Sequence, residues 1–478
     1  MKHMVTYAIL GSYLLFTLVL TVWSARRSQQ TPDDYFLADR TFGPVVLFFT
    51  LIATNFSAFF FLGFSGMGYR VGYSYYPMMA FGTALVGLTF YFIGQPAAVL
   101  GRKKGYITPP EMLGDLLQSR SLKFVFLTVM VVFTLPYLAV QPIGAGYVLE
   151  ELTQRQIPYF WGASTLTIFI VMYVFVGGMR SVAWTDVFQG VLMLILMLLA
   201  VGVIASSLGG FEAANLKAHT LQPDLFHEVG KKNFFTSSKW FSLMLLWFFC
   251  VPMFPQLFMR FFTPRSARSL QVSAALYPIV TAILFLCPVM IGVWGHIDFP
   301  GLTGKAPNNI LPMMLGKHAP IWLGAFVMVG ALAAFMSTLD SQLLALSSML
   351  TRDLYVGWWK KDASLREQVV VGRVLVVLLA IAGLIIAYRP PQSIFGMLKE
   401  AFTGLAVLFP TTVAALYWRK TNANACVTSI LVGEGIWFGF YMGWIPKSWS
   451  FGFLPVIPIL CIVTLVIVVG SMLKPRAT

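Results

Sequence analysis

The chain has 478 residues, of which 58% are hydrophobic and only 11% are charged, with a mean hydropathy of +0.78 and a formal net charge of +15. Soluble globular domains carry about 25% charged residues, so this composition excludes an ordinary soluble globule and indicates a polytopic membrane protein. The four cysteines, Cys250, Cys287, Cys426 and Cys461, lie in apolar runs without metal-ligand spacing, so they imply neither a disulfide framework nor a zinc site.

Apolar runs long enough to cross a bilayer recur along the whole sequence. A bilayer core requires about 20 apolar residues per helix. By this criterion the sequence predicts an all-α protein with about thirteen transmembrane helices, over residues 5–24, 44–68, 75–98, 123–148, 157–177, 185–207, 239–262, 271–296, 319–350, 371–388, 394–418, 425–444 and 452–472. We therefore expect residues 1–478 to form a single integral membrane domain.

The basic residues predict how these helices are oriented. An odd number of spans puts the two termini on opposite sides of the membrane. With the amino terminus outside and the carboxyl terminus in the cytoplasm, most Lys and Arg residues fall in or next to cytoplasmic segments, as the positive-inside rule requires. The run Arg102, Lys103 and Lys104 then determines topology, and we expect the lipid bilayer, not nucleic acid, as its surroundings.

Two predicted spans are interrupted by residues that break helices. The second contains the polar stretch 53–58 followed by Gly63, Gly66 and Gly68, and the seventh contains Pro252 and Pro255. Such breaks free backbone carbonyls and are tolerated where they line a cavity or bind an ion, although each alone is equally compatible with an ordinary kink. They lie five spans apart, as expected if spans two to six and seven to eleven were two repeats.

The ninth span is apolar but carries a cluster of hydroxyl and carboxylate side chains. At about 100° per residue, Ser337, Asp340, Ser341 and Ser348 fall within an arc of about 100°, with Thr338 beside them. Such hydroxyls often bond to helix carbonyls or to neighbouring helices, whereas a carboxylate at membrane depth is by default a functional hypothesis. Oxygen ligands suit sodium and a carboxylate suits a proton, so the residues predict cation-coupled transport and leave the cation open.

Four stretches together resemble the sodium/solute symporter family, which includes sodium/proline, sodium/glucose, sialic acid and pantothenate transporters. They are AAFMSTLDSQLL at 333–344 with TRDLY at 351–355, GGMRSVAWTDVFQ at 177–189, PQLFMRFF at 255–262 and DYFLADR at 34–40. The resemblance implies a five-plus-five inverted-repeat fold with one helix before the repeats and two after. The corresponding divisions are residues 1–40, 41–207 for the first repeat, 238–418 for the second and 419–478.

The resemblance also implies the ligands of a sodium ion. Carried over by motif, these are the carbonyls of Ala53, Phe56 and Ala334 and the hydroxyls of Ser337 and Thr338. Some members have a second sodium site, which would involve Asp186, Ser337 and Ser341. Here Asp340 stands where such members often have Ser or Thr. Its carboxylate would strengthen a second ion site, carry a proton or pair with a basic residue, and these alternatives stay open.

Solute-binding residues are predicted from their positions near the breaks. Asn55 and Ser57 on the second span and Gln141 on the fourth are placed to face a central cavity. For Gln141, an interhelical hydrogen bond is an equal alternative. Lys399 and Glu400 would pair with each other or contact an anionic solute, and no role is predicted for Glu434. No motif distinguishes an amino acid, a sugar or a carboxylate as the solute, and no oligomeric state is predicted.

We therefore predict a secondary active symporter in the cytoplasmic membrane, in which inward sodium movement drives uptake of a small organic solute by alternating access. Proton coupling through Asp340 or Asp186 is the alternative in the same class. From another class, a channel would show flux without saturation, and a membrane sensor would usually carry a soluble output domain. An enzyme is not expected, because no nucleophile–base pair and no metal-spaced His/Cys set is present.

Overall fold

The computed structural model describes residues 2–26, 31–390 and 394–474. All regular secondary structure within these residues is helical, and a single isolated bridge joins Phe42 to Pro264. Parts of the predicted loop after the first span and of the carboxyl-terminal tail lie outside the described residues.

The helices of the amino-terminal half lead from a first peripheral helix into the broken second span. They are α1 (Lys2–Ala25), α2 (Pro32–Leu37), η1 (Ala38–Arg40), α3 (Pro44–Asn55), η2 (Phe59–Gly63), α4 (Phe64–Val71), α5 (Tyr75–Ala84), α6 (Val86–Thr89), η3 (Phe90–Gly94), α7 (Gln95–Lys104), α8 (Pro109–Leu116), α9 (Arg120–Leu152), α10 (Tyr159–Ser207) and α11 (Phe211–Leu221).

The helices of the carboxyl-terminal half begin with two short connecting turns. They are η4 (Pro223–Phe226), η5 (Lys231–Asn233), α12 (Ser237–Cys250), η6 (Val251–Met253), α13 (Pro255–Arg260), α14 (Ala267–Asp298), η7 (Ala306–Asn309), α15 (Ile310–His318), α16 (Ile321–Met349), η8 (Leu350–Trp359), α17 (Leu365–Tyr388), α18 (Ile394–Ala406), α19 (Leu408–Tyr417), α20 (Ala423–Tyr441), η9 (Lys447–Ser450) and α21 (Val456–Leu473).

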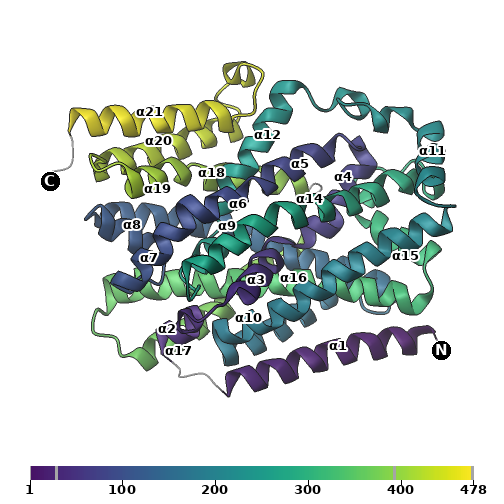
Figure 1. Cartoon of the computed structure of the whole chain (residues 1–478), viewed down its shortest axis with the longest axis horizontal. Helices are drawn as coiled ribbons and strands as arrows, with labels where there is room; N and C mark the ends of the chain where they lie inside the picture. The colour runs from purple at the N-terminus through teal and green to yellow at the C-terminus, as the bar shows by residue number, and fades with distance from the viewer. Residues whose placement is uncertain (1, 27–30, 391–393, 475–478) are drawn as a thin grey trace.

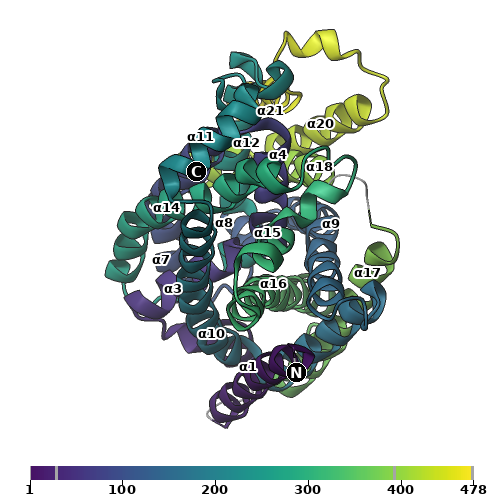
Figure 2. The same ribbon diagram turned by 90° about the vertical axis from the view of Figure 1, so that its right-hand side faces the viewer.

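The long helices lie side by side in one bundle, with α1 on one outer face and α20 and α21 on the opposite face (Figure 1). Seen from one end of the bundle, α16 lies among the other helices rather than at the edge (Figure 2). It contacts α1, α3, α9, α10, α13 and α17, and nearly all of its side chains from Val327 to Met349 are buried. The hydroxyl-rich span predicted from the sequence is therefore the central helix of the fold.

Among the described residues, ten helices are long and apolar enough to cross a membrane, and the pair α3 and η2–α4, bent by 55°, makes an eleventh candidate. The fifth and sixth predicted spans are continuous in α10, which has 49 residues and a kink at Gly178 with φ 54° and ψ −152°. The seventh predicted span is divided between α12, with 14 residues, and the six-residue α13. The count of thirteen stays a prediction.

The second half of the broken span is held against α14 by glycines that allow the two backbones to touch. A Cβ atom on Gly292 would lie 2.1 Å from the carbonyl oxygen of Ser65, and one on Gly68 would lie 2.5 Å from that of Val289. Small residues at such contacts let helices approach closely inside a membrane. This contact positions α4 relative to the break at Phe56.

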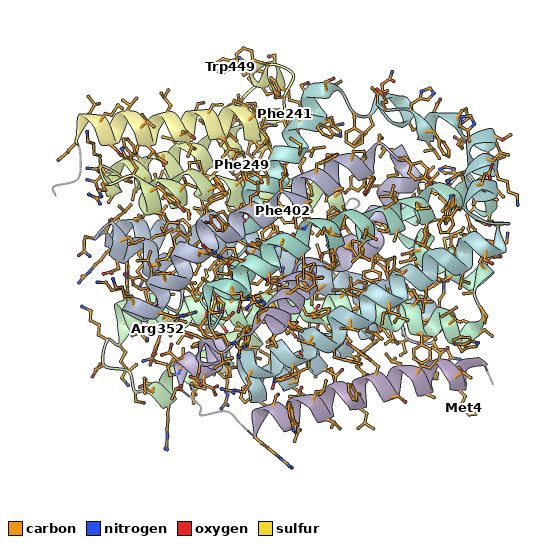
Figure 3. The ribbon with its side chains drawn as sticks, in the orientation of Figure 1. Met4, Phe241, Phe249, Arg352, Phe402 and Trp449 are labelled. Atoms are coloured by element: carbon orange, nitrogen blue, oxygen red, sulfur yellow. The ribbon has the colours of Figure 1, made fainter. Side chains whose placement is uncertain are left out.

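Ion pairs hold short helices and connecting segments at the end of the bundle where α7 and α8 lie. Arg352 and Met4 mark opposite ends of the molecule in Figure 3. Arg352 pairs with Glu111 at 2.9 Å, and Lys123 pairs with the buried Asp353 at 2.9 Å. Since α8 carries Glu111 and η8 carries Arg352, these pairs connect the end of the central helix to the segment after α7.

Candidate cation and solute site

The broken span provides carbonyl oxygens that no helix uses. Helix α3 ends at Asn55, and Phe56 has extended backbone angles, φ −86° and ψ 103°. The N–H of Phe56 still donates to Ile52, but among the described residues no backbone N–H donates to the carbonyls of Ala53, Thr54 or Phe56. The end of any helix leaves such carbonyls unpaired, and inside a membrane they require other partners.

Helix α16 directs two hydroxyls at these carbonyls. The Ser337 hydroxyl lies 2.9 Å from the Ala53 oxygen and 3.0 Å from the Ala334 oxygen, and Thr338 Oγ1 lies 3.3 Å from the oxygens of both Thr54 and Phe56. The structure thus brings together all five predicted sodium ligands and adds the Thr54 carbonyl. Every oxygen in this group is uncharged. A hard monovalent cation such as sodium can be bound by uncharged carbonyl and hydroxyl oxygens. Sodium binding at this group stays a prediction.

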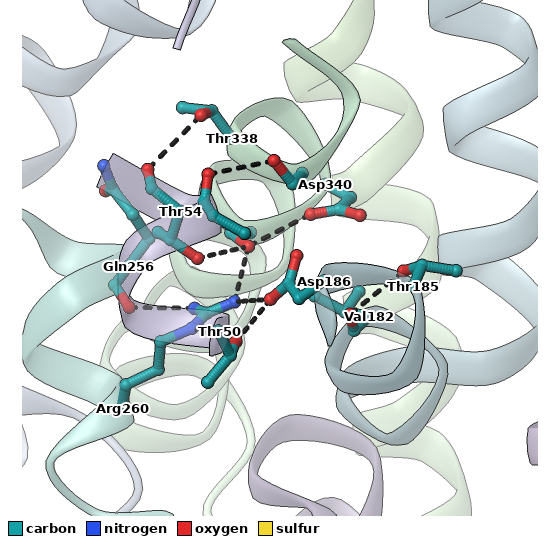
Figure 4. A network of polar contacts seen from close by, with 12 residues as sticks. Thr50, Thr54, Val182, Thr185, Asp186, Gln256, Arg260, Thr338 and Asp340 are labelled. Atoms are coloured by element: carbon teal, nitrogen blue, oxygen red, sulfur yellow. Dashed lines mark hydrogen bonds and ion pairs between the residues drawn. The ribbon is translucent and has the colours of Figure 1, made fainter. Parts of the chain in front are cut away.

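A second cluster surrounds Asp186 (Figure 4). Arg260 forms an ion pair with Asp186 at 2.9 Å and donates from Nε to Thr50 Oγ1 at 2.7 Å, while Thr50 donates to the same carboxylate. The guanidinium also donates to the Gln256 carbonyl at 2.9 Å. Both charged side chains are 0% exposed and therefore lack contact with water. The ion pair between them compensates each charge for this lost solvation.

Ser341 joins the two clusters. It accepts from Arg260 at 2.5 Å, donates to Asp340 Oδ1 at 3.0 Å, and lies 3.2 Å from the Thr54 hydroxyl. Tyr173 on α10 donates to the other oxygen of Asp340 at 2.5 Å. Asp186, Ser341 and Asp340 therefore lie in one hydrogen-bonded network, which contains two carboxyl groups and a single guanidinium among the described residues.

The sequence interpretation missed several members of this network, among them Arg260, Thr50 and Tyr173. Arg260 follows the break at Pro252 and Pro255. A charged side chain so close to a broken span indicates a functional role, so the sequence could have predicted Arg260 as a site residue. Thr50 and Tyr173 carried no signal, since hydroxyls recur throughout the apolar helices. Their roles depend on helices α3 and α10 being packed against α16.

The predicted solute residues separate into two groups. Asn55 and Ser57 line a cavity of about 20 Å³, room for about one water molecule, which is otherwise bordered mainly by aromatic rings. Gln141 does not line it. The Gln141 side-chain oxygen instead accepts from the Ala58 N–H at 3.0 Å, just after the break. This is the interhelical hydrogen bond named as its alternative role, and direct solute contact stays a prediction.

Bulky side chains lie next to the cavity in both directions along the broken span. Phe402 of α18 packs against Phe254 and Tyr137, with ring centroids 4.8 and 5.2 Å apart, and lies inside the bundle (Figure 3). Phe395, near the start of the same helix α18, stacks on Phe59 with ring centroids 6.3 Å apart. In the opposite direction along α3, the Arg260 side chain lies next to Thr50 and donates to its hydroxyl.

The remaining ionisable residues singled out in the sequence lie apart from this network. Lys399 pairs with Glu400 at 2.8 Å, and Glu400 also accepts from the indole of Trp437 at 3.3 Å. The carboxylate oxygens of Glu434 are buried, with no hydrogen-bond partner in the described part of the chain. None of these contacts reaches the broken span.

Comparison with known proteins identifies the fold and the family. A model of the sodium:solute symporter family matches residues 35–433, most of the chain. The chain belongs to the sodium:solute symporter family. It is therefore a multi-pass membrane transporter and not an enzyme, as its curated relatives are symporters.

Relatives of this family member match over nearly their whole lengths. The sodium/pantothenate symporter of Escherichia coli (strain K12) is 28% identical over 469 residues, covering 97% of this chain and 95% of the relative. The sodium/proline symporter of Staphylococcus aureus (strain JH9) is 26% identical over 494 residues, covering 99% and 94%. A solved Na⁺-coupled sialic acid symporter, substrate-bound and outward-open, matches with a TM-score of 0.83 at 20% identity over 99% of both chains. The last comparison concerns the fold.

Proposed function

We propose that the protein couples inward sodium movement to the uptake of a small organic solute by alternating access. The observation that carries this proposal is the group of uncharged oxygens where α16 meets the broken span, in which the Ser337 and Thr338 hydroxyls donate, over 2.9 to 3.3 Å, to carbonyls that accept no backbone N–H among the described residues. A sodium ion at this group would tie two helices together. Opening that separates them would remove half of its ligands and release it.

Coupling follows from the position of the solute cavity. Asn55 and Ser57 flank Phe56, whose carbonyl belongs to the proposed sodium ligands. An ion that fixes the conformation of this segment therefore organises the solute residues on either side of it. By linkage, sodium raises the affinity for solute by the same factor as solute raises the affinity for sodium.

We propose the remaining architecture on the same basis. Thirteen spans result if α10 crosses twice, turning at Gly178, and if α12 with α13 counts as one further broken span. The proposed repeats are then residues 41–207 and 238–418, with the amino terminus outside. The relatives transport pantothenate and proline, and the solved symporter binds sialic acid, which supports a small organic solute. Asp186, Ser341 and Asp340 are the proposed second ion site.

The sodium assignment is tested by Thr338→Ala. We expect this variant to need at least about tenfold more sodium for half-maximal solute uptake, because the loss of one charge–oxygen contact costs about 1.5–3 kcal/mol. Thr167→Ala is a matched control, since Thr167 is also buried but, within the described part of the chain, its hydroxyl bonds only to the Ala163 carbonyl of its own helix at 2.7 Å. Unchanged sodium dependence in Thr338→Ala would show that the sodium site is wrongly placed.

Proton coupling is the second candidate, because Asp340 accepts hydrogen bonds from Tyr173 and Ser341, and Ser341 in turn connects it to the ion pair between Arg260 and Asp186. Uptake into vesicles with an imposed sodium gradient at equal pH on both sides separates the two. A sodium gradient alone suffices under the first proposal. Uptake that requires a pH gradient, and that is abolished in Asp340→Asn, would support proton coupling instead.

A further inference from the structure

The peripheral helix α1 meets the rest of the bundle through hydroxyl side chains. It lies on one outer face of the bundle and contacts α10 and α16 (Figure 1). Every buried residue that the structure describes between Met4 and Ala25 carries a hydroxyl group: Thr6, Tyr13, Thr17, Thr21 and Ser24. A helix that served only as a membrane anchor would not need such a stripe, because apolar helix surfaces and lipid require no hydrogen bonds.

Tyr13 is the member of this stripe whose hydroxyl connects α1 to the central helix. The hydroxyl donates to Met336 Sδ on α16 at 3.3 Å and accepts from Gln189 Nε2 on α10 at 2.8 Å. By contrast, the hydroxyls of Thr17 and Thr21 donate to carbonyls of α1 itself, at 3.0 and 2.9 Å. Tyr13 therefore joins three helices through a single hydroxyl group.

The Gln189 side chain depends on this contact. It is 0% exposed, and its Oε1 has no hydrogen-bond partner among the residues that the structure describes. Within the same residues, the bond from Nε2 to Tyr13 is the only hydrogen bond of this amide. A buried amide without any partner costs free energy, so loss of the Tyr13 hydroxyl favours displacement of Gln189.

The two side chains bonded to this hydroxyl belong to residues that adjoin the proposed sodium group. Met336 directly precedes Ser337, whose hydroxyl donates to the Ala53 carbonyl at 2.9 Å. Gly190 directly follows Gln189, and a Cβ atom on Gly190 would lie 3.7 Å from the Cβ of Ala53. Both sides of the contact between Ser337 and Ala53 are therefore next to a residue that the tyrosine hydroxyl holds.

We infer that Tyr13 is a positioning residue of the sodium site. Its hydroxyl holds α10 and α16 in the relative position that keeps the Ser337 hydroxyl and the Ala53 carbonyl within reach of one ion. Groups that orient ion ligands without touching the ion change the affinity of the site. This inference rests on the proposed sodium-coupled transport. It goes further by giving α1, which supplies no proposed sodium ligand, a role in sodium affinity.

The inference is tested with Tyr13→Phe, which removes the hydroxyl and keeps the ring. The purified full-length protein is unfolded by heat at increasing sodium chloride, with potassium chloride keeping the ionic strength constant. An ion that binds the folded state raises the unfolding midpoint by mass action, so this dependence yields a sodium dissociation constant. We expect the constant to rise about three- to tenfold in Tyr13→Phe. A hydroxyl that only supported packing would lower the midpoint in potassium and leave the constant unchanged, which would overturn the inference.

Tyr159→Phe is the matched control. The Tyr159 hydroxyl also bonds to another helix, since it donates to the Ala387 carbonyl of α17 at 2.8 Å, but that carbonyl does not belong to the sodium group. We expect this variant to keep the sodium dissociation constant of the wild-type protein. A rise as large as that in Tyr13→Phe would show that any lost interhelical hydroxyl weakens sodium binding, and the assignment of Tyr13 would be wrong.

Gln189→Leu is a second, independent variant, which removes the amide that the Tyr13 hydroxyl holds. We expect it to raise the sodium dissociation constant as Tyr13→Phe does. The double variant should bind sodium no more weakly than the weaker of the two single variants, because the hydroxyl and the amide act as one unit. Additive losses in the double variant would contradict the inference.

The inference and the proposed function fail separately. A wild-type protein that sodium does not stabilise relative to potassium would contradict the proposed function itself. Stabilisation of the wild-type protein by sodium, with unchanged dissociation constants in both Tyr13→Phe and Gln189→Leu, would contradict only the role of Tyr13.

Discussion

The ion pair between Arg260 and Asp186 gives the strongest prediction about stability. Arg260→Gln removes the only guanidinium bonded to Asp186 among the described residues and leaves a carboxylate that is 0% exposed. Removing one partner of a buried ion pair costs about 3–5 kcal/mol, because the other charge is left uncompensated. Three further bonds of Arg260 are lost as well, to Thr50, Ser341 and the Gln256 carbonyl. We therefore expect Arg260→Gln to lie at or above the upper end of this range.

The assay is thermal unfolding of the purified protein in detergent and in potassium, so that sodium binding does not contribute. The double variant Arg260→Gln with Asp186→Asn removes both charges and should be clearly more stable than Arg260→Gln alone. The effects of two substitutions on stability do not add when the residues are in direct contact. The difference between the double variant and the single variant therefore measures the interaction between the two charges. If the double variant unfolded at or below the midpoint of Arg260→Gln, the uncompensated carboxylate would not be the cause of the instability.

Three further variants test the packing of the broken span. Gln141→Leu should lower the free energy of unfolding by about 1–3 kcal/mol, because the Ala58 N–H loses its acceptor; an unchanged unfolding midpoint would mean that another group replaces it. Gly292→Ala should be severely destabilising, since its Cβ would lie 2.1 Å from a backbone carbonyl, whereas Gly202→Ala, with nothing within 4 Å, should be neutral in the same unfolding assay. Phe395→Ala should open the cavity and increase the rate of labelling of a cysteine introduced at the cavity, and an unchanged rate would exclude Phe395 as a gate.

The sequence by itself determined the membrane class, the broken second span and the polar face of the ninth. These are local properties. A continuous apolar run specifies burial in lipid, and glycine or a polar stretch within it leaves carbonyls unpaired wherever the helix is finally placed. The family motifs further selected Ala53, Phe56, Ala334, Ser337 and Thr338, and the structure places them side by side.

Only the tertiary structure decided what the other polar groups contact. Arg260 and Asp186 are separated by 74 positions in the chain, and nothing in either segment encodes their distance. The same applies to Tyr173 with Asp340 and to Gln141 with the Ala58 N–H. Each of these roles depends on which helices pack together, because a side chain in an apolar helix has its partner chosen by the neighbouring helix and not by its own sequence.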